Sequence, residues 1–372
     1  MPSNHLAEYS VVYTERGLNH MSVAFQQVMC DLNQILTATY QAEQAVIIPG
    51  GGSYAMESVA RQIARDKKIL ILRNGWFSYR WTQILERGAI SHDIDVLTAY
   101  PEDPANLQST WQPHPLEDVL SYISEHKPDL IFAPHIETSS GIRLPEEYIR
   151  AVAKAAHDNN GLFVLDCIAS GANWVNMQQT GVDILISAPQ KGWSAPPCAG
   201  FVMLSERGNQ AIDNSESDSF SNDLKQWRTI MRAYLDGGHA YHATMPTNAL
   251  AQCRDEMQAA VDYGLNKLSE AQIELGTQIR NTLVEAGYPC VAADGWQANG
   301  VIVCHTTRDD FHNGSAFKNQ GMQIAGGVPL ACNEPEGFKT FRIGLFGLDK
   351  WQNVASCVEK FKSTLEQINI ES

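Results

Sequence analysis

Short, fully apolar runs alternate with amphipathic segments through the first two thirds of the chain. AVIIP (45–49), KILILRN (68–74) and DLIFAP (129–134) have the length of strands, and their charged or polar residues stand only at the ends. The same pattern recurs at 161–166, 182–188 and 199–205. Segments such as YAMESVARQIAR between these runs carry apolar residues at helical spacing. Strands that are apolar on both faces and separated by such helices predict a mostly parallel sheet covered by helices on both faces.

The pattern changes after about residue 250. Residues 249–287 predict one long, broken helix, and shorter strands follow at 300–306 and 339–346. A terminal amphipathic helix, WQNVASCVEKFKSTLEQI, completes the chain. This α+β arrangement predicts a second, smaller domain, which agrees with the size at which single cores usually split.

Composition narrows the function classes. The 372 residues carry a net charge of −15, which argues against a nucleic-acid or anionic-membrane partner. No apolar run reaches the ~18–20 residues of a membrane span, and the first residues lack a secretory signal. Eight cysteines without a CxxC pair predict free thiols in a reducing cytoplasm, and eleven histidines without an HExxH motif predict no metal site.

The glycine-rich segment GGGSYA (50–55) follows a predicted strand and begins a predicted helix. Backbone N–H groups at such a helix start bind anions. The segment formally matches the dinucleotide fingerprint, but the second strand ends in Arg73-Asn74 where that fingerprint requires an acidic residue. We therefore interpret it as a phosphate cradle, with a ligand-free tight turn as the alternative.

Two charged residues follow consecutive predicted strands. Asp166 ends the run FVLD, and Lys191 lies just after VDILIS in SAPQKGW. Since ligands in α/β sheets bind beyond the carboxyl ends of strands, both side chains are expected to reach one crevice. A buried Asp–Lys ion pair, or two unrelated charges at the rim, are the alternatives.

Seven motifs occur in an order that resembles the class V aminotransferases of pyridoxal-phosphate (PLP) fold type I. They are PGGGSYAMES, RNGWFSYR, PHIETSSG, LDCIAS, SAPQKGWSAPP, YHATMP and FRIGLFG. Within that family the chain is most similar to the alanine–glyoxylate and serine–pyruvate aminotransferase branch. The resemblance implies a mostly parallel central sheet with helices on both faces and a smaller C-terminal α+β domain. It also implies PLP as cofactor and a homodimer with a shared active site.

The resemblance assigns the main chemical roles residue by residue. Lys191 matches the lysine that forms a Schiff base with PLP and then shuttles a proton. Asp166 matches the carboxylate that keeps the pyridine nitrogen protonated. Arg342, in FRIGLFG, matches the arginine that binds the substrate carboxylate through a bidentate fork.

Further cofactor-binding positions follow from the same motifs. The phosphate-binding residues implied are Gly51, Gly52, Ser53 and Gln190. Thr138 matches a hydroxyl near the ring oxygen of the cofactor.

The resemblance also implies an aromatic residue against the cofactor ring, for which there are two candidates. It further implies that one motif contacts the cofactor of the neighbouring subunit. Phe77 matches the aromatic residue that stacks on the cofactor ring, with Trp76 as a competing assignment. Tyr241 and Thr244, in YHATMP, match groups that reach the phosphate from the neighbouring subunit.

The sequence departs from the family pattern most clearly near its N-terminus. The family usually has a Gly-Pro-rich loop there, whereas this chain reads YSVVYTERGLNHMS, so Tyr13, Thr14 and Arg16 are expected to shape a different substrate pocket. We expect residues 1–24 to contribute to that pocket, 25–260 to form the large PLP-binding domain, and 261–372 to form the small domain.

The leading hypothesis is an aminotransferase that moves an amino group from a small amino acid, such as alanine or serine, to glyoxylate or pyruvate. A phosphonate-directed aminotransferase or a PLP-dependent lyase of the same family are alternatives. Outside the family, the alternatives are a non-catalytic PLP-binding protein and an NAD-dependent oxidoreductase. Lys191, Asp166 and Arg342 together disfavour the first, because a scaffold does not need a group that binds the substrate carboxylate. The missing acidic residue after the second strand and the unexplained Lys191 disfavour the second.

Overall fold

The computed structural model describes residues 6–370, and its centre is a seven-stranded sheet in the order β1-β9-β8-β7-β6-β2-β3. The strands are β1 (Gln44–Pro49), β2 (Ile69–Arg73), β3 (Ile94–Thr98), β6 (Leu130–Pro134), β7 (Leu162–Asp166), β8 (Ile184–Ser187) and β9 (Ala199–Leu204). All neighbouring pairs from β3 to β8 are parallel, while β9 is antiparallel to both β8 and β1. The predicted mostly parallel sheet is confirmed, with one reversed strand.

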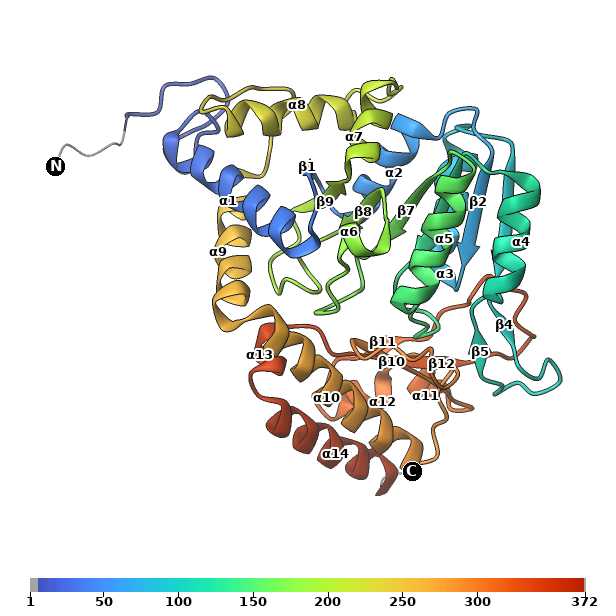
Figure 1. Ribbon diagram of the computed structural model, residues 1–372. Helices are drawn as coiled ribbons and strands as arrows, with labels where there is room; N and C mark the ends of the chain where they lie inside the picture. Colours follow the sequence, from blue (N-terminus) through green and yellow to red (C-terminus); the bar gives the residue numbers. More distant parts are fainter. Residues whose placement is uncertain (1–5, 371–372) are drawn as a thin grey trace.

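Helices lie on both faces of this sheet, as predicted (Figure 1). They are α1 (Val23–Tyr40), α2 (Gly52–Ile63), α3 (Trp76–Arg87), α4 (Leu116–His126), α5 (Glu146–Asp158), α6 (Met177–Thr180), α7 (Glu206–Asp213) and α8 (Leu224–Leu235). Right-handed crossovers place α2 and α3 on one face, since their connections run along the sheet in one direction. The connections through α4, α5 and α6 run in the opposite direction, so these helices cover the other face.

The C-terminal part forms a second, smaller sheet below the first one (Figure 1). The predicted long helix is α9 (Thr247–Tyr263) and α10 (Leu265–Glu285), broken at Gly264, whose φ of 109° few other residues adopt. The antiparallel sheet has the order β10-β12-β11. The remaining elements are β10 (Val301–His305), α11 (Asp309–His312), α12 (Ser315–Asn319), β11 (Ala325–Gly326), β12 (Thr340–Gly344), α13 (Leu348–Trp351) and α14 (Val354–Ile370), with the hairpin β4 (Tyr100–Pro101) and β5 (Trp111–Gln112). No helix within residues 6–370 has the length and hydropathy that crossing a bilayer requires.

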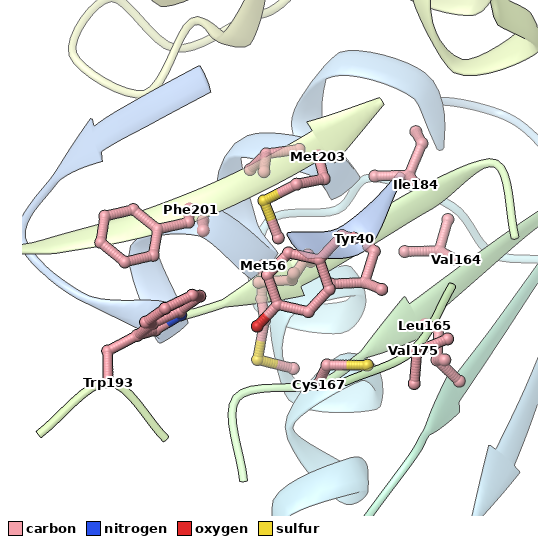
Figure 2. Packing of buried hydrophobic residues seen from close by; sticks show 14 of the residues in the cluster. Tyr40, Met56, Val164, Leu165, Cys167, Val175, Ile184, Trp193, Phe201 and Met203 are labelled. Carbon is pink, nitrogen blue, oxygen red and sulfur yellow. The ribbon is translucent and has the colours of Figure 1, made fainter. Parts of the chain in front are cut away.

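The core reaches directly beneath the turn that carries Lys191. Trp193, two residues further along, is fully buried and packs against Trp174, with ring centroids 4.6 Å apart, and against Tyr40. Figure 2 shows Trp193 beside Phe201 of β9 and close to Tyr40. The Tyr40 hydroxyl also donates to Ser187 Oγ, at the end of β8, over 3.1 Å. The turn after β8 is therefore held from below by large aromatic side chains.

Candidate active site

Several chemistry-bearing loops meet at one edge of the large sheet. Pro134, the last residue of β6, pairs with Asp166, the last residue of β7, and Asp166 pairs in turn with Ile186 of β8. The strands are parallel, so the loops after them emerge side by side. Those loops carry HIETSSG, LDCIAS and SAPQKGW, and the turns after β1 and β2 begin α2 and α3 at the same edge.

The start of α2 is open. Gly50 has a φ of 120°, a conformation that strongly favours glycine, and no side chain of residues 6–370 caps the helix at Gly51. A Cβ placed on Gly51 would meet nothing within 4 Å, so space lies directly above the helix start. The Ser53 hydroxyl, in the first turn, accepts a 2.7 Å hydrogen bond from the Arg80 guanidinium. These groups form an anion cradle, defined here as Gly50–Ser53 with Arg80.

The start of α3 is filled by a buried carboxylate. Glu137 is fully buried, and its two oxygens accept from the amides of Phe77 and Ser78 at 3.2 and 2.8 Å. The Ser78 hydroxyl and both the amide and hydroxyl of Ser139 also donate to it. A Cβ on Gly75 would come within 2.1 Å of Ser139 Oγ, so only glycine permits this close approach. The result is a rigidly held helix end that fixes the side chains of its first turns.

Asp166 is a carboxylate with little internal compensation. It is 9% exposed, and within residues 6–370 one hydrogen bond to it is found, from the Ile168 amide to Oδ1 at 2.9 Å. Burial raises the pKa of Asp166 to about 6, and the fields of Lys191 and Arg80 oppose that shift only partly. A cation or an N–H donor that binds against its free oxygen would therefore stabilise the charged form of this carboxylate strongly.

Lys191 lies on a turn after β8 with its Nζ between two phenyl rings. The centroid of Phe77 is 6.0 Å from Nζ and that of Phe346 is 5.4 Å away. Burial lowers the pKa of Lys191 below its ordinary value, and the positive charge of Arg342 lowers it further, whereas Asp166 raises it. A lowered pKa increases the fraction of neutral amine, the form that acts as nucleophile and base.

Three cations surround the Phe77 ring. The guanidinium carbons of Arg80 and Arg342 each lie 5.5 Å from its centroid, beside Lys191 Nζ. None of the three forms an ion pair with a carboxylate in the described part of the chain. Arg342 donates through Nε to the Gly326 carbonyl over 2.8 Å, which leaves the rest of its fork free of ion pairs. Because Arg342 belongs to the small sheet and Phe77 to α3, the site lies between the two sheets and favours anions.

The structure separates the two aromatic candidates. Phe77 faces Lys191 and Arg342, whereas Trp76 pairs with Tyr79, with ring centroids 5.5 Å apart. Thr138 is buried in the loop after β6, next to Glu137, and Gln190 is exposed immediately before Lys191.

The N-terminal segment lies against the YHATMP segment. The Tyr13 hydroxyl donates to the Met245 carbonyl over 3.4 Å, and its ring lies 5.6 Å from that of His20. The His20 ring is 5.4 Å from Tyr241, whose hydroxyl shares a 3.0 Å hydrogen bond with Thr244. Tyr13, Tyr241 and Thr244 therefore form one surface cluster, and Tyr241 is 54% exposed.

Sequence reasoning misses three residues of this site. Arg80 belongs to the motif RNGWFSYR, Glu137 to HIETSSG and Phe346 to FRIGLFG, yet the motifs alone assign no role to them. A lone glutamate in an otherwise uncharged, small-residue loop is the available signal for Glu137, since such a carboxylate needs several donors when buried.

Comparison with known proteins gives a consistent result. The sequence profile of the family described as aminotransferase class-V matches residues 4–327. The alanine–glyoxylate aminotransferase of Oryctolagus cuniculus is 26% identical over 342 residues, covering 89% of this chain and 82% of that protein. The solved alanine–glyoxylate aminotransferase of Nostoc sp. has a TM-score of 0.78 at 18% identity, covering 94% of this chain and 89% of that one. The ureidoglycine–glyoxylate aminotransferase of Bacillus subtilis has a TM-score of 0.78 at 20% identity, covering 97% and 89%.

Proposed function

The chain belongs to the class V aminotransferase family and is a PLP-dependent transaminase, and from that premise we propose its substrates and its site residues. It moves an amino group from a small amino acid, alanine or serine, to a small 2-oxo acid, glyoxylate or pyruvate. The observation that carries the proposal is the grouping of Lys191, Arg80 and Arg342 around Phe77, none of them in an ion pair within residues 6–370. Asp166, whose carboxylate accepts one hydrogen bond there, interacts electrostatically with Lys191 and Arg80. The names of the relatives, alanine–glyoxylate aminotransferases, agree with a small donor and a small acceptor.

The polar groups of the candidate site fit PLP. The anion cradle with its open helix start, Ser53 and Arg80 suits a phosphate group. Asp166, which lacks a strong internal donor, suits a protonated pyridine nitrogen. We assign Gly51, Gly52, Gln190 and Thr138 to the same cofactor on their motif positions, and the face of Phe77 to its ring. When bound, PLP supplies an electrophilic aldehyde carbon and a ring that accepts electrons from the substrate Cα.

Lys191 acts as the nucleophile and as the proton carrier. Its lowered pKa increases the fraction of neutral amine, the form that would hold PLP covalently, and Nζ would take the proton from the substrate Cα and return one to the product. Asp166 holds the proton on the ring nitrogen through its negative charge. Arg342 binds the substrate carboxylate and orients Cα toward Lys191, since a planar fork pairs with a carboxylate through two hydrogen bonds.

We further propose a homodimer in which each site is completed by the partner. Tyr241 and Thr244 lie on an exposed surface with Tyr13, rather than beside Lys191 of their own chain, and this position suits contacts with a second subunit. The proposed division is an N-terminal segment 1–24, a cofactor domain 25–260 and a small domain 261–372. A cytoplasmic location is proposed because eight cysteine thiols, six of them buried, persist most readily in a reducing compartment.

Replacement of Arg342 tests this proposal. Truncating one partner of a buried charge pair costs roughly 2–5 kcal/mol, so Arg342→Ala should lower kcat/KM for alanine and serine about 30- to several thousand-fold. Arg342→Lys serves as a control that retains the charge without the fork, and it should recover part of the loss. The PLP dissociation constant should be unchanged in both variants. Equal, small losses for alanine and for an amine without a carboxylate would remove Arg342 from the site, and no transfer by the wild type from any small amino acid would overturn the proposed substrates.

A further inference from the structure

Phe346 lies next to the atom at which the amino group is exchanged. It follows β12 by two residues, in the same segment as Arg342, and its ring centroid is 5.4 Å from Lys191 Nζ. The ring is half-buried and packs against the second hydrophobic cluster of the protein. Phe77 lies 6.0 Å from the same nitrogen. The ring of Phe77, from α3, and the ring of Phe346, from the segment after β12, therefore both lie near Nζ.

Its neighbours hold the Phe346 ring in place. The Leu345 amide donates to the Gly300 carbonyl over 2.9 Å, and the Phe346 carbonyl accepts from Lys350 Nζ over 2.9 Å. A Cβ on Gly300 would come within 2.9 Å of Phe346 Cε1, so the ring edge lies directly on the Gly300 backbone and has no room to retreat there. Ser194, three residues after Lys191, accepts a hydrogen bond from the Leu348 amide, which ties this segment to the lysine turn.

Distances then limit the substrate. A substrate nitrogen placed where Lys191 Nζ lies would have its Cβ about 2.5 Å away. A Cβ directed at the ring centroid would approach it to roughly 3 Å, inside the ~3.5–4.0 Å of carbon–carbon contact. Cβ must therefore pass beside the ring, and each further carbon that extends toward Phe346 collides with a ring that the Gly300 backbone supports.

We propose that Phe346 determines substrate specificity by excluding amino donors that carry more than one heavy atom beyond Cβ. This inference rests on the proposed function and makes its substrate class specific. Arg342 fixes the carboxylate and Phe346 blocks the space that a longer side chain needs. Glycine, alanine and serine are accepted, and linear or branched aliphatic donors with longer side chains are rejected.

The test compares donors of increasing length in matched variants. kcat/KM is measured for alanine, 2-aminobutyrate and norvaline with one acceptor, using the PLP-loaded wild type, Phe346→Ala and Phe338→Ala. Phe338 is a suitable control because it is a half-buried phenylalanine of the same cluster that contacts Trp111 and His305 instead of Lys191. Phe346→Leu replaces the alanine variant if the latter does not fold. Dissociation constants of propionate and pentanoate, which are not turned over, are measured by calorimetry as a second readout.

One methylene in an apolar pocket is worth roughly 10–200-fold in discrimination. The wild type should therefore prefer alanine to norvaline by at least about 100-fold, and Phe346→Ala should reduce this preference to within about tenfold, while Phe338→Ala retains it. Pentanoate should bind the wild type more weakly than propionate and bind Phe346→Ala more tightly. If the wild type is active and Phe346→Ala keeps the same preference for alanine over norvaline, the role of Phe346 is overturned but the proposed function is not. A wild type that transfers from none of the donors overturns the proposed function, and the carboxylate constants then decide the size limit independently.

Discussion

Helices α2 and α3 begin in similar ways, but the amides of their first turns have different partners. Each helix has twelve residues, follows a strand of the large sheet and begins after a glycine, Gly51 or Gly75. At α3 the amides of the first turn are occupied by Glu137 and Ser139. At α2 no side chain in the described part of the chain accepts from the amides of residues 51–53, and a Cβ on Gly51 would point into open space.

The difference distinguishes a helix start that has a structural role, in α3, from one that is available to a ligand, in α2. A helix start concentrates partial positive charge, and both starts need an anion. The chain supplies its own carboxylate to α3, because that helix must hold Phe77 and Arg80 in fixed positions. It leaves α2 open, so the anion there has to come from outside.

Removal of the internal anion should have the largest effect. Glu137→Ala leaves five buried donors without their acceptor, each worth roughly 1–3 kcal/mol when unsatisfied, and water compensates for some of them. The free energy of unfolding of the cofactor-free protein should fall by about 3–5 kcal/mol, measured in urea. Glu147→Ala, at the exposed first turn of α5, is the control and should cost little. A loss below about 1 kcal/mol for Glu137→Ala would mean that α3 does not depend on this carboxylate.

A carboxylate introduced at the start of α2 should occupy its first-turn amides, as Glu137 occupies those of α3. Gly51 has an extended φ of −175° that any residue adopts, and a Cβ there would meet nothing within 4 Å. Gly51→Asp should leave the stability of the cofactor-free protein unchanged or slightly raised. It should weaken PLP binding by about 100- to 1000-fold, since like charges about 4 Å apart repel by about 4 kcal/mol at intermediate dielectric. Gly51→Ala controls for size, and equal PLP dissociation constants for the two variants would refute the cradle.

Asp166 should have a smaller effect, which depends on pH, on the free energy of unfolding. In the cofactor-free protein its pKa is about 6, against an ordinary value of 3.8. The folded state therefore binds more protons than the unfolded state between about pH 4 and 6, and stability falls as the pH rises through this window. Relative to Asp166→Asn, the wild type should lose about 2–3 kcal/mol between pH 4 and 7. Urea unfolding at several pH values checks this, and a constant difference between the two proteins would show that Asp166 is compensated internally.

The sequence predicted much of the large sheet and the central pair of the site for a physical reason. Strands without a polar face must be buried on both sides, and ligand groups then follow their carboxyl ends, which located Asp166 and Lys191. The reversed direction of β9 could not be predicted, because a buried strand has the same apolar pattern in either direction.

The missed residues depend on contacts between distant parts of the chain. Glu137 binds amides 59 and 60 positions earlier in the chain, and Phe346 meets Lys191 across the gap between the two sheets. The choice between Trp76 and Phe77 likewise depends on where α3 begins, since neighbouring helical residues point about 100° apart. Glu137 binds the amides at that helix start, and because it lies about 60 positions away, the sequence around α3 does not reveal this contact.

We propose that the open start of α2 and the turn after β8 hold one cofactor between them, with Lys191 as its covalent partner. Reduction of the PLP-loaded protein with borohydride, followed by proteolysis and peptide mapping, tests this most directly. We expect a pyridoxyl group on Lys191 in the wild type and little label in Gly51→Asp at a PLP concentration that saturates Gly51→Ala. A label on any other lysine of the wild type, or equal labelling of the two Gly51 variants, would contradict it.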